Sequence, residues 1–157
     1  MSKSLLVVLA FLLASCGLPN DPEGTLERVE GSSMRVGITD SPPWTVVNDG
    51  EPAGVEATLT GQLARDLDAE IEWVEGSESE ILEAIELGHL DLAIGGFTAD
   101  NPWSKKVTFI QPYYALGEDQ HVMAVPHGEN AWIVRIERFL RSRLDDIPGL
   151  LREHAST

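Results

Sequence analysis

Leu90-Asp-Leu-Ala-Ile-Gly-Gly-Phe-Thr98 is the stretch that decides how this chain folds. From Leu90 to Gly95 every position except Asp91 is apolar, which is typical of a central parallel strand covered on both faces. The two glycines that close the run allow the backbone to approach another group closely. We therefore expect this strand in the middle of a sheet, with helices packed on both sides.

The residues before this strand alternate between strand and helix patterns. Residues 34–38 and 70–74 alternate apolar and polar side chains, and three leucines spaced four apart give residues 56–67 one buried helical face. A second helix begins at a sequence with capping-box spacing, residues 77–80, and ends at Gly88. The order strand, helix, strand, helix, strand predicts an α/β domain with a mostly parallel sheet.

The remaining segments complete this domain. Residues 44–47, 107–110 and 120–125 are short apolar stretches that we expect as strands. Residues 130–144 carry an apolar stripe at helical spacing, and Pro148 forces a break before a last amphipathic turn.

The amino terminus predicts export. Residues 5–13 form an apolar run that is too short to span a bilayer and is typical of a signal peptide. Leu13-Ala14-Ser15-Cys16 resembles the lipobox of bacterial lipoproteins, in which the cysteine is lipidated; an ordinary secretory signal is the alternative. We expect a signal peptide over residues 1–15, a flexible tether over 16–33, and one domain over 34–157. Lipidation of Cys16, the only cysteine, would anchor the chain to a membrane in the periplasm or another extracytoplasmic compartment.

Charge limits the choice of partners. The chain has 26 acidic and 11 basic side chains, a formal net charge of -15, so nucleic acid is not expected as a partner. Such a surface is soluble and favours cationic ligands. The four histidines have no metal-ligand spacing, and we expect neither a metal site nor a cofactor.

Several segments together resemble the family 3 extracellular solute-binding proteins of ABC importers. They recur in the order and spacing of that family from Met34 to Tyr114, and they include Asp49-Gly-Glu-Pro-Ala-Gly-Val-Glu56, the central stretch 90–98, and Val107-Thr-Phe-Ile-Gln-Pro-Tyr-Tyr114. The resemblance implies the fold of these proteins, in which two α/β lobes joined by a hinge close on amino acids or similar solutes.

Two departures from the family pattern change the expected function. The family places its whole second lobe after the Pro-Tyr-Tyr segment, but only residues 115–121 precede Val122 here. We therefore expect a single lobe, with an antiparallel returning strand over 120–125 and half of the cleft missing. The family also commonly has an arginine that pairs with the α-carboxylate of the ligand; Trp103 stands at that position, which argues against a conventional amino-acid site.

The resemblance and the fold together suggest where a solute binds. Ligand crevices of open α/β sheets lie beyond the carboxyl ends of the strands. The loops after the first and third strands supply the candidates, with aromatic walls, flexible glycines and polar groups: Asp40, Trp44, Gly95, Gly96, Phe97, Thr98 and Trp103. With Asp100 nearby, this set suits an amine-bearing solute. The alternative is that the tryptophans only cover the end of the sheet, and Glu56 is expected to cap its helix.

We therefore expect a non-enzymatic envelope lipoprotein with a truncated solute-binding lobe. No nucleophile–base pair is visible in the sequence. Catalysis of this kind needs a closed site that excludes water, whereas a single lobe leaves its site open. A second hypothesis is a degenerate interaction or sensor module that docks a permease, a receptor or a second copy of itself through an exposed apolar half-cleft.

Overall fold

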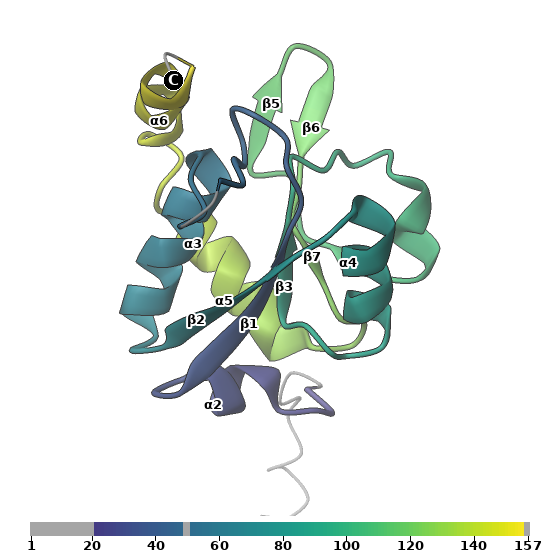
Figure 1. The fold of residues 1–157 in the computed structure, drawn as a ribbon. Helices are drawn as coiled ribbons and strands as arrows, with labels where there is room; N and C mark the ends of the chain where they lie inside the picture. The colour runs from purple at the N-terminus through teal and green to yellow at the C-terminus, as the bar shows by residue number, and fades with distance from the viewer. Residues whose placement is uncertain (1–20, 49–50, 156–157) are drawn as a thin grey trace, which may run out of the picture.

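The computed structural model describes residues 21–48 and 51–155, which form one α/β unit around a five-stranded sheet (Figure 1). The sheet order is β2-β1-β3-β7-β4, and a separate hairpin pairs β5 with β6. The first three strands are parallel, and β7 returns antiparallel between β3 and β4. The strands are β1 (Ser33–Ile38), β2 (Glu70–Glu75), β3 (Leu92–Ile94), β4 (Thr108–Phe109), β5 (Tyr114–Leu116), β6 (Asp119–His121) and β7 (Ala124–Val125).

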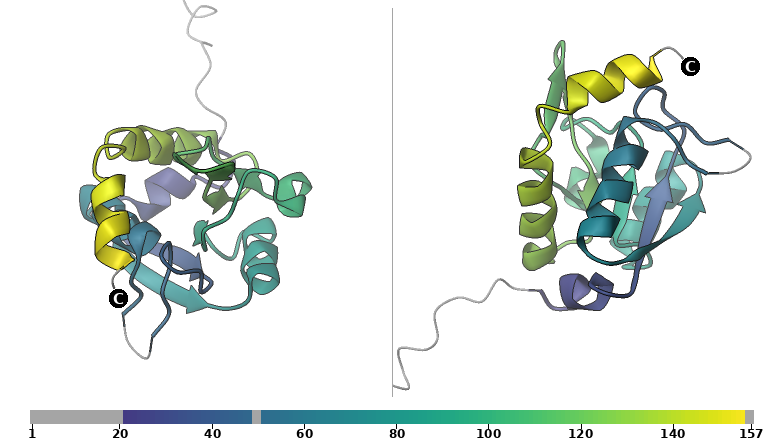
Figure 2. Two further views of the ribbon diagram at one scale, coloured as in Figure 1. Left: turned by 90° about the horizontal axis from the view of Figure 1, so that it is seen from above. Right: turned by 90° about the vertical axis from the view of Figure 1, so that its left-hand side faces the viewer.

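Helices cover both faces of the sheet, as predicted (Figures 1 and 2). Leu92 and Ile94 of β3 join the core cluster beneath α3 and α5, whereas Ala93 faces the cluster beneath α4. All three side chains are completely buried, which is why this strand shows no alternation in its sequence. The helices are α2 (Thr25–Val29), α3 (Val55–Asp66), α4 (Glu78–Glu86), the 3-10 helix η1 (Pro102–Lys105), α5 (Asn130–Arg141) and α6 (Ile147–His154).

Three predicted elements differ in detail. The strand expected over 120–125 is divided between β6 in the hairpin and β7 in the sheet. The strand expected over 44–47 is replaced by isolated bridges. The long helix ends at Arg141. Pro148 lies in the first turn of α6, where backbone N–H groups have no partner within the helix, so proline is tolerated there.

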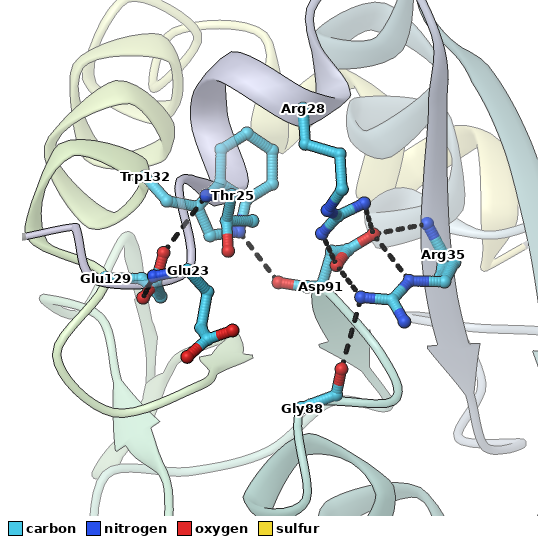
Figure 3. Close-up of polar contacts among 8 residues, drawn as sticks. All are labelled: Glu23, Thr25, Arg28, Arg35, Gly88, Asp91, Glu129 and Trp132. Atoms are coloured by element: carbon cyan, nitrogen blue, oxygen red, sulfur yellow. Dashed lines mark hydrogen bonds and ion pairs between the residues drawn. The ribbon is translucent and has the colours of Figure 1, made fainter.

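The flexible tether predicted over residues 16–33 is wrong for its second half. Residues 21–29, here called the strap, pack against the domain, and Val29 is completely buried. The carboxylate of Glu129 accepts hydrogen bonds from the backbone N–H groups of Glu23 (3.0 Å), just before α2, and of Thr25 (3.1 Å), the first residue of α2 (Figure 3). These contacts join residues more than 100 positions apart, so no local sequence pattern predicts them. The predicted signal peptide and Cys16 lie outside the described residues.

Asp91 connects the strap to the central strand (Figure 3). Its buried carboxylate accepts hydrogen bonds from the guanidinium groups of Arg28 and Arg35 and from the backbone N–H of Arg35 at 2.8 Å. The indole N–H of Trp132 donates to the backbone oxygen of Asp91 at 2.7 Å. Burial alone would raise the pKa of Asp91, but the hydrogen bonds from the two arginines outweigh it and hold that pKa below its ordinary value. Asp91 is thus an ion-paired anchor for α2, β1 and α5.

Within residues 21–48 and 51–155, no helix has the length and apolar character needed to cross a bilayer.

Candidate functional site

The loops after β1 and β3 lie side by side at the carboxyl edge of the sheet, as predicted. The backbone N–H of Thr39 donates to the oxygen of Ile94 at 3.2 Å, and the turn at Gly95 and Gly96 packs against Trp44. Gly96 has φ +63°, and a Cβ there would lie 2.9 Å from the Trp44 ring. A side chain at Gly96 would therefore force the two loops apart.

Glu56 holds this turn in place, although its sequence position suggested only a helix cap. It is completely buried, and Oε2 accepts hydrogen bonds from the backbone N–H groups of Gly95 (2.8 Å) and Gly96 (2.9 Å). Oε1 accepts a hydrogen bond of 2.5 Å from the hydroxyl of Tyr113. The cap position of α3 is Gly54, without a side-chain cap, so the expectation for Glu56 is wrong.

Burial governs the protonation of this cluster. It raises the pKa of Glu56, and the hydrogen bonds from Gly96, Tyr113 and Gly95 partly oppose that rise. Burial and the neighbouring Glu56 together raise the pKa of Tyr113 well above its ordinary value, so its hydroxyl remains a donor. Glu56 thereby fixes α3, the glycine turn and the start of the hairpin relative to one another.

The aromatic wall predicted from Trp44, Phe97 and Trp103 does not form. Phe97 packs in the cluster beneath α4, beside Phe109 at 6.2 Å between ring centroids. Trp103 packs against the same cluster, and the Lys106 ammonium lies 4.8 Å from its ring centroid. Trp44 belongs to the other core cluster. The exposed apolar half-cleft is also absent from the described structure, because Trp44 and Phe97 are only 4% and 3% exposed.

The β5–β6 hairpin, residues 114–121, covers Trp44. The ring of His121 lies over that of Trp44 with centroids 3.8 Å apart, and Tyr113 and Tyr114 pack around the same indole at 6.2 and 6.0 Å. On its other side β6 pairs with the loop after β3, through Ala99 N to Gln120 O at 2.9 Å. The two tyrosines and His121 thus close the apolar end of the sheet.

A pocket with an acidic lining remains open at this edge. A shallow pocket of about 190 Å³ lies between the loop after β3 and the hairpin, lined by Ala99, Asp100, Glu118, Asp119 and Gln120. Thr98 donates a hydrogen bond to Asp100 at 2.6 Å and so orients one of the three carboxylates. Asp40 is exposed and accepts a hydrogen bond from the backbone N–H of Val47. None of the described residues that line the pocket is basic, so the pocket suits an ammonium or guanidinium group.

No three His, Cys, Asp or Glu side chains within the described ranges 21–48 and 51–155 gather closely enough to hold a metal ion.

His121 is expected to make the fold sensitive to mild acid. Burial lowers its pKa, partly offset by Asp119, so the folded protein holds the ring neutral where the unfolded chain would protonate it. Stability from this group is complete above pH 6.5 and is lost as the pH falls through the lower folded pKa. The melting temperature should drop less between pH 7.5 and 5.5 in His121→Phe than in the parent. An equal drop would contradict this role.

The fold defines a periplasmic-binding-protein lobe, and the sequence gives its family. The chain belongs to the bacterial extracellular solute-binding proteins, family 3, whose model matches residues 34–150. The predicted relationship to the binding proteins of ABC importers is thereby confirmed. Membership of this family implies a periplasmic or other extracytoplasmic location.

Solved structures share this lobe. The arginine-bound form of domain 1 of TmArgBP, from T. maritima, is 25% identical, with a TM-score of 0.64 over 71% of this chain and 93% of that chain. AbpA of Streptococcus pneumoniae, bound to L-arginine, is 13% identical (TM-score 0.67; 79% and 94% covered). The ancestral amino acid-binding protein AncCDT-1, a precursor of cyclohexadienyl dehydratase, is 15% identical (TM-score 0.66; 80% and 94% covered). A comparison with curated proteins finds no match.

Proposed function

We propose that this protein is a lipid-anchored, non-enzymatic receptor lobe for a small solute that carries an amine or guanidine group. The observation that supports this most directly is the pocket at the carboxyl edge, which Asp100, Glu118 and Asp119 line and whose described lining residues include no basic side chain. The arginine-bound domain 1 of TmArgBP gives further support, because there one lobe alone holds a cationic amino acid.

The same geometry predicts weak binding. The pocket is shallow, and only residues 115–121 separate Tyr114 from Val122, where the family resemblance places the lobe that would enclose the solute. Trp103 stands where the family commonly has an arginine, and its ring is covered by Lys106. The carboxylate of an amino acid therefore adds little to the binding free energy, and we expect dissociation constants on the order of 0.1–1 mM. Diamines should bind at least as well as amino acids.

Titration of the purified chain with arginine, agmatine, putrescine and glutamate tests this function by NMR. The three cationic solutes should shift the amide signals of Asp100, Glu118 and Asp119, and glutamate should not. Asp100→Asn or Glu118→Gln should weaken binding about fivefold, which corresponds to about 1 kcal/mol for a solvent-exposed ion pair. Glu83→Gln on the outer face of α4 is the matched control. A preference for glutamate, or silence with all four solutes, would refute the assignment.

The anchor is a separate part of the proposal. The export signal and the Leu-Ala-Ser-Cys16 sequence support lipidation, which would attach the lobe to a membrane. Mass spectrometry of protein extracted from cells should find diacylglycerol on Cys16 at the new amino terminus. An unmodified thiol at Cys16 would refute the anchor and leave solute binding unaffected.

A docking or sensor role for a permease or receptor is the second candidate. The observation that favours it is Leu116 at the tip of the hairpin, which is 49% exposed beside two acidic residues. Because those residues would repel a second copy, this surface fits a basic partner better than self-association. Concentration-dependent self-association in sedimentation, with no response to solutes, would instead favour pairing of two copies.

A further inference from the structure

The strap and the solute pocket lie at opposite ends of the lobe. In Figure 1 and in the right-hand view of Figure 2, α2 lies below the start of β1, whereas the β5–β6 hairpin rises from the other end of the sheet. The strap is held there by Glu129 at the start of α5 and by Asp91 just before β3 (Figure 3). The chain therefore approaches the lobe from the end that is opposite to the pocket.

The strap also shortens the connection to Cys16. Seven residue steps separate Cys16 from Glu23, the first residue bonded to Glu129, and they span at most about 25 Å when fully extended. Had residues 16–33 been a free tether, seventeen steps would span up to about 60 Å. A lobe of this size has a radius of gyration of about 14 Å and is about 37 Å across.

These lengths decide how an anchored lobe can lie. To turn its pocket toward the membrane, the lobe would have to raise the strap end about 37 Å above the lipid surface. A connection of about 25 Å cannot reach that far, whereas one of about 60 Å could.

We propose that the strap holds the carboxyl edge away from the membrane, so that the pocket opens to the aqueous compartment. This inference rests on the lipid anchor of the proposed function. It identifies the surface offered to partners as the one around the β5–β6 hairpin, within reach of a soluble or periplasmic domain. A permease pore in the same membrane would meet the pocket only after the strap had detached.

The orientation can be measured with the full chain purified from membranes in its lipid-bearing form. A fluorescent dye is attached at Asn130→Cys, beside the strap, or at Glu118→Cys, at the hairpin tip. Each protein is reconstituted in phosphatidylcholine vesicles that carry a headgroup-linked quencher. The dye at residue 130 should lose most of its fluorescence, and the dye at residue 118 should lose little.

A longer connection provides the matched control. Inserting twenty Gly/Ser residues after Asn20 leaves the strap contacts intact, and it should make quenching at the two sites nearly equal. Equal quenching without the insertion, or stronger quenching at residue 118, would overturn the orientation while leaving the anchor in place. Protein that does not float with vesicles and has a free thiol at Cys16 would refute the anchor, and the orientation with it.

Discussion

Glu56→Ala is expected to lower the free energy of unfolding by about 4 kcal/mol, because it leaves the N–H groups of Gly95 and Gly96 and the Tyr113 hydroxyl without their acceptor. Such a loss is a large part of the total stability of a domain of this size. The glycine turn should also loosen, so solute binding should disappear even where the variant remains folded. Urea denaturation and amide hydrogen exchange at Gly95 and Gly96 measure the two effects.

Glu56→Gln is the control for this prediction. A glutamine keeps an acceptor oxygen for the two glycines, and its amide can donate to the Tyr113 oxygen. The expected loss is about 1 kcal/mol, with exchange at the turn nearly unchanged. Equal losses for the two variants would show that the negative charge is what matters, and a loss below about 1 kcal/mol for the alanine variant would contradict the bracing role.

Asp91→Ala should cost about 3 kcal/mol, because it removes a buried carboxylate that receives hydrogen bonds from two arginines and one backbone N–H. The side chains of Arg28 and Arg35 are 42% and 33% exposed, so both can be solvated once the carboxylate is removed. The loss of stability is therefore smaller than for a fully buried ion pair. The strap should detach, seen as rapid exchange at the backbone N–H of Thr25. Urea denaturation measures the stability.

Two comparisons make the Asp91 prediction specific. Glu83→Gln changes an exposed carboxylate on α4 and should leave stability within about 0.5 kcal/mol of the parent. Arg28→Ala should release the strap at lower cost, since Asp91 keeps its bonds with Arg35. A strap that stays protected in both Asp91→Ala and Arg28→Ala would show that Val29 and its apolar neighbours hold it without the ion pair.

The sequence predicted the lobe because its helices and strands follow local periodicity. The apolar run before Gly95 and the spaced leucines of α3 correctly placed a central strand between helix layers. The strap was missed because Arg28–Asp91 and Thr25–Glu129 pair residues that are 63 and 104 positions apart, and a segment rich in Pro, Gly and acidic residues otherwise reads as a linker.

The site was predicted less well than the fold. Gly96 lies against Trp44, whereas Phe97 and Trp103 pack in the other core cluster, so the structure does not bring the predicted residues into one wall; their role in solute binding stays a prediction. Glu56 could have been found, because it lies three and seven residues before Leu59 and Leu63 on the buried face of α3. The role of His121 had no local signal, since it depends on how a hairpin folds back over Trp44.

The turn of that hairpin has an evolutionary meaning. Leu116 and Asp119 face each other across only Gly117 and Glu118, in the segment where the family resemblance places the insertion of a second lobe. Chain ends that already lie together allow a whole domain to be removed or inserted there without remodelling the rest. The bond between Gly117 and Glu118 is therefore a suitable insertion point, at which gene fusion could add a second domain to this lobe.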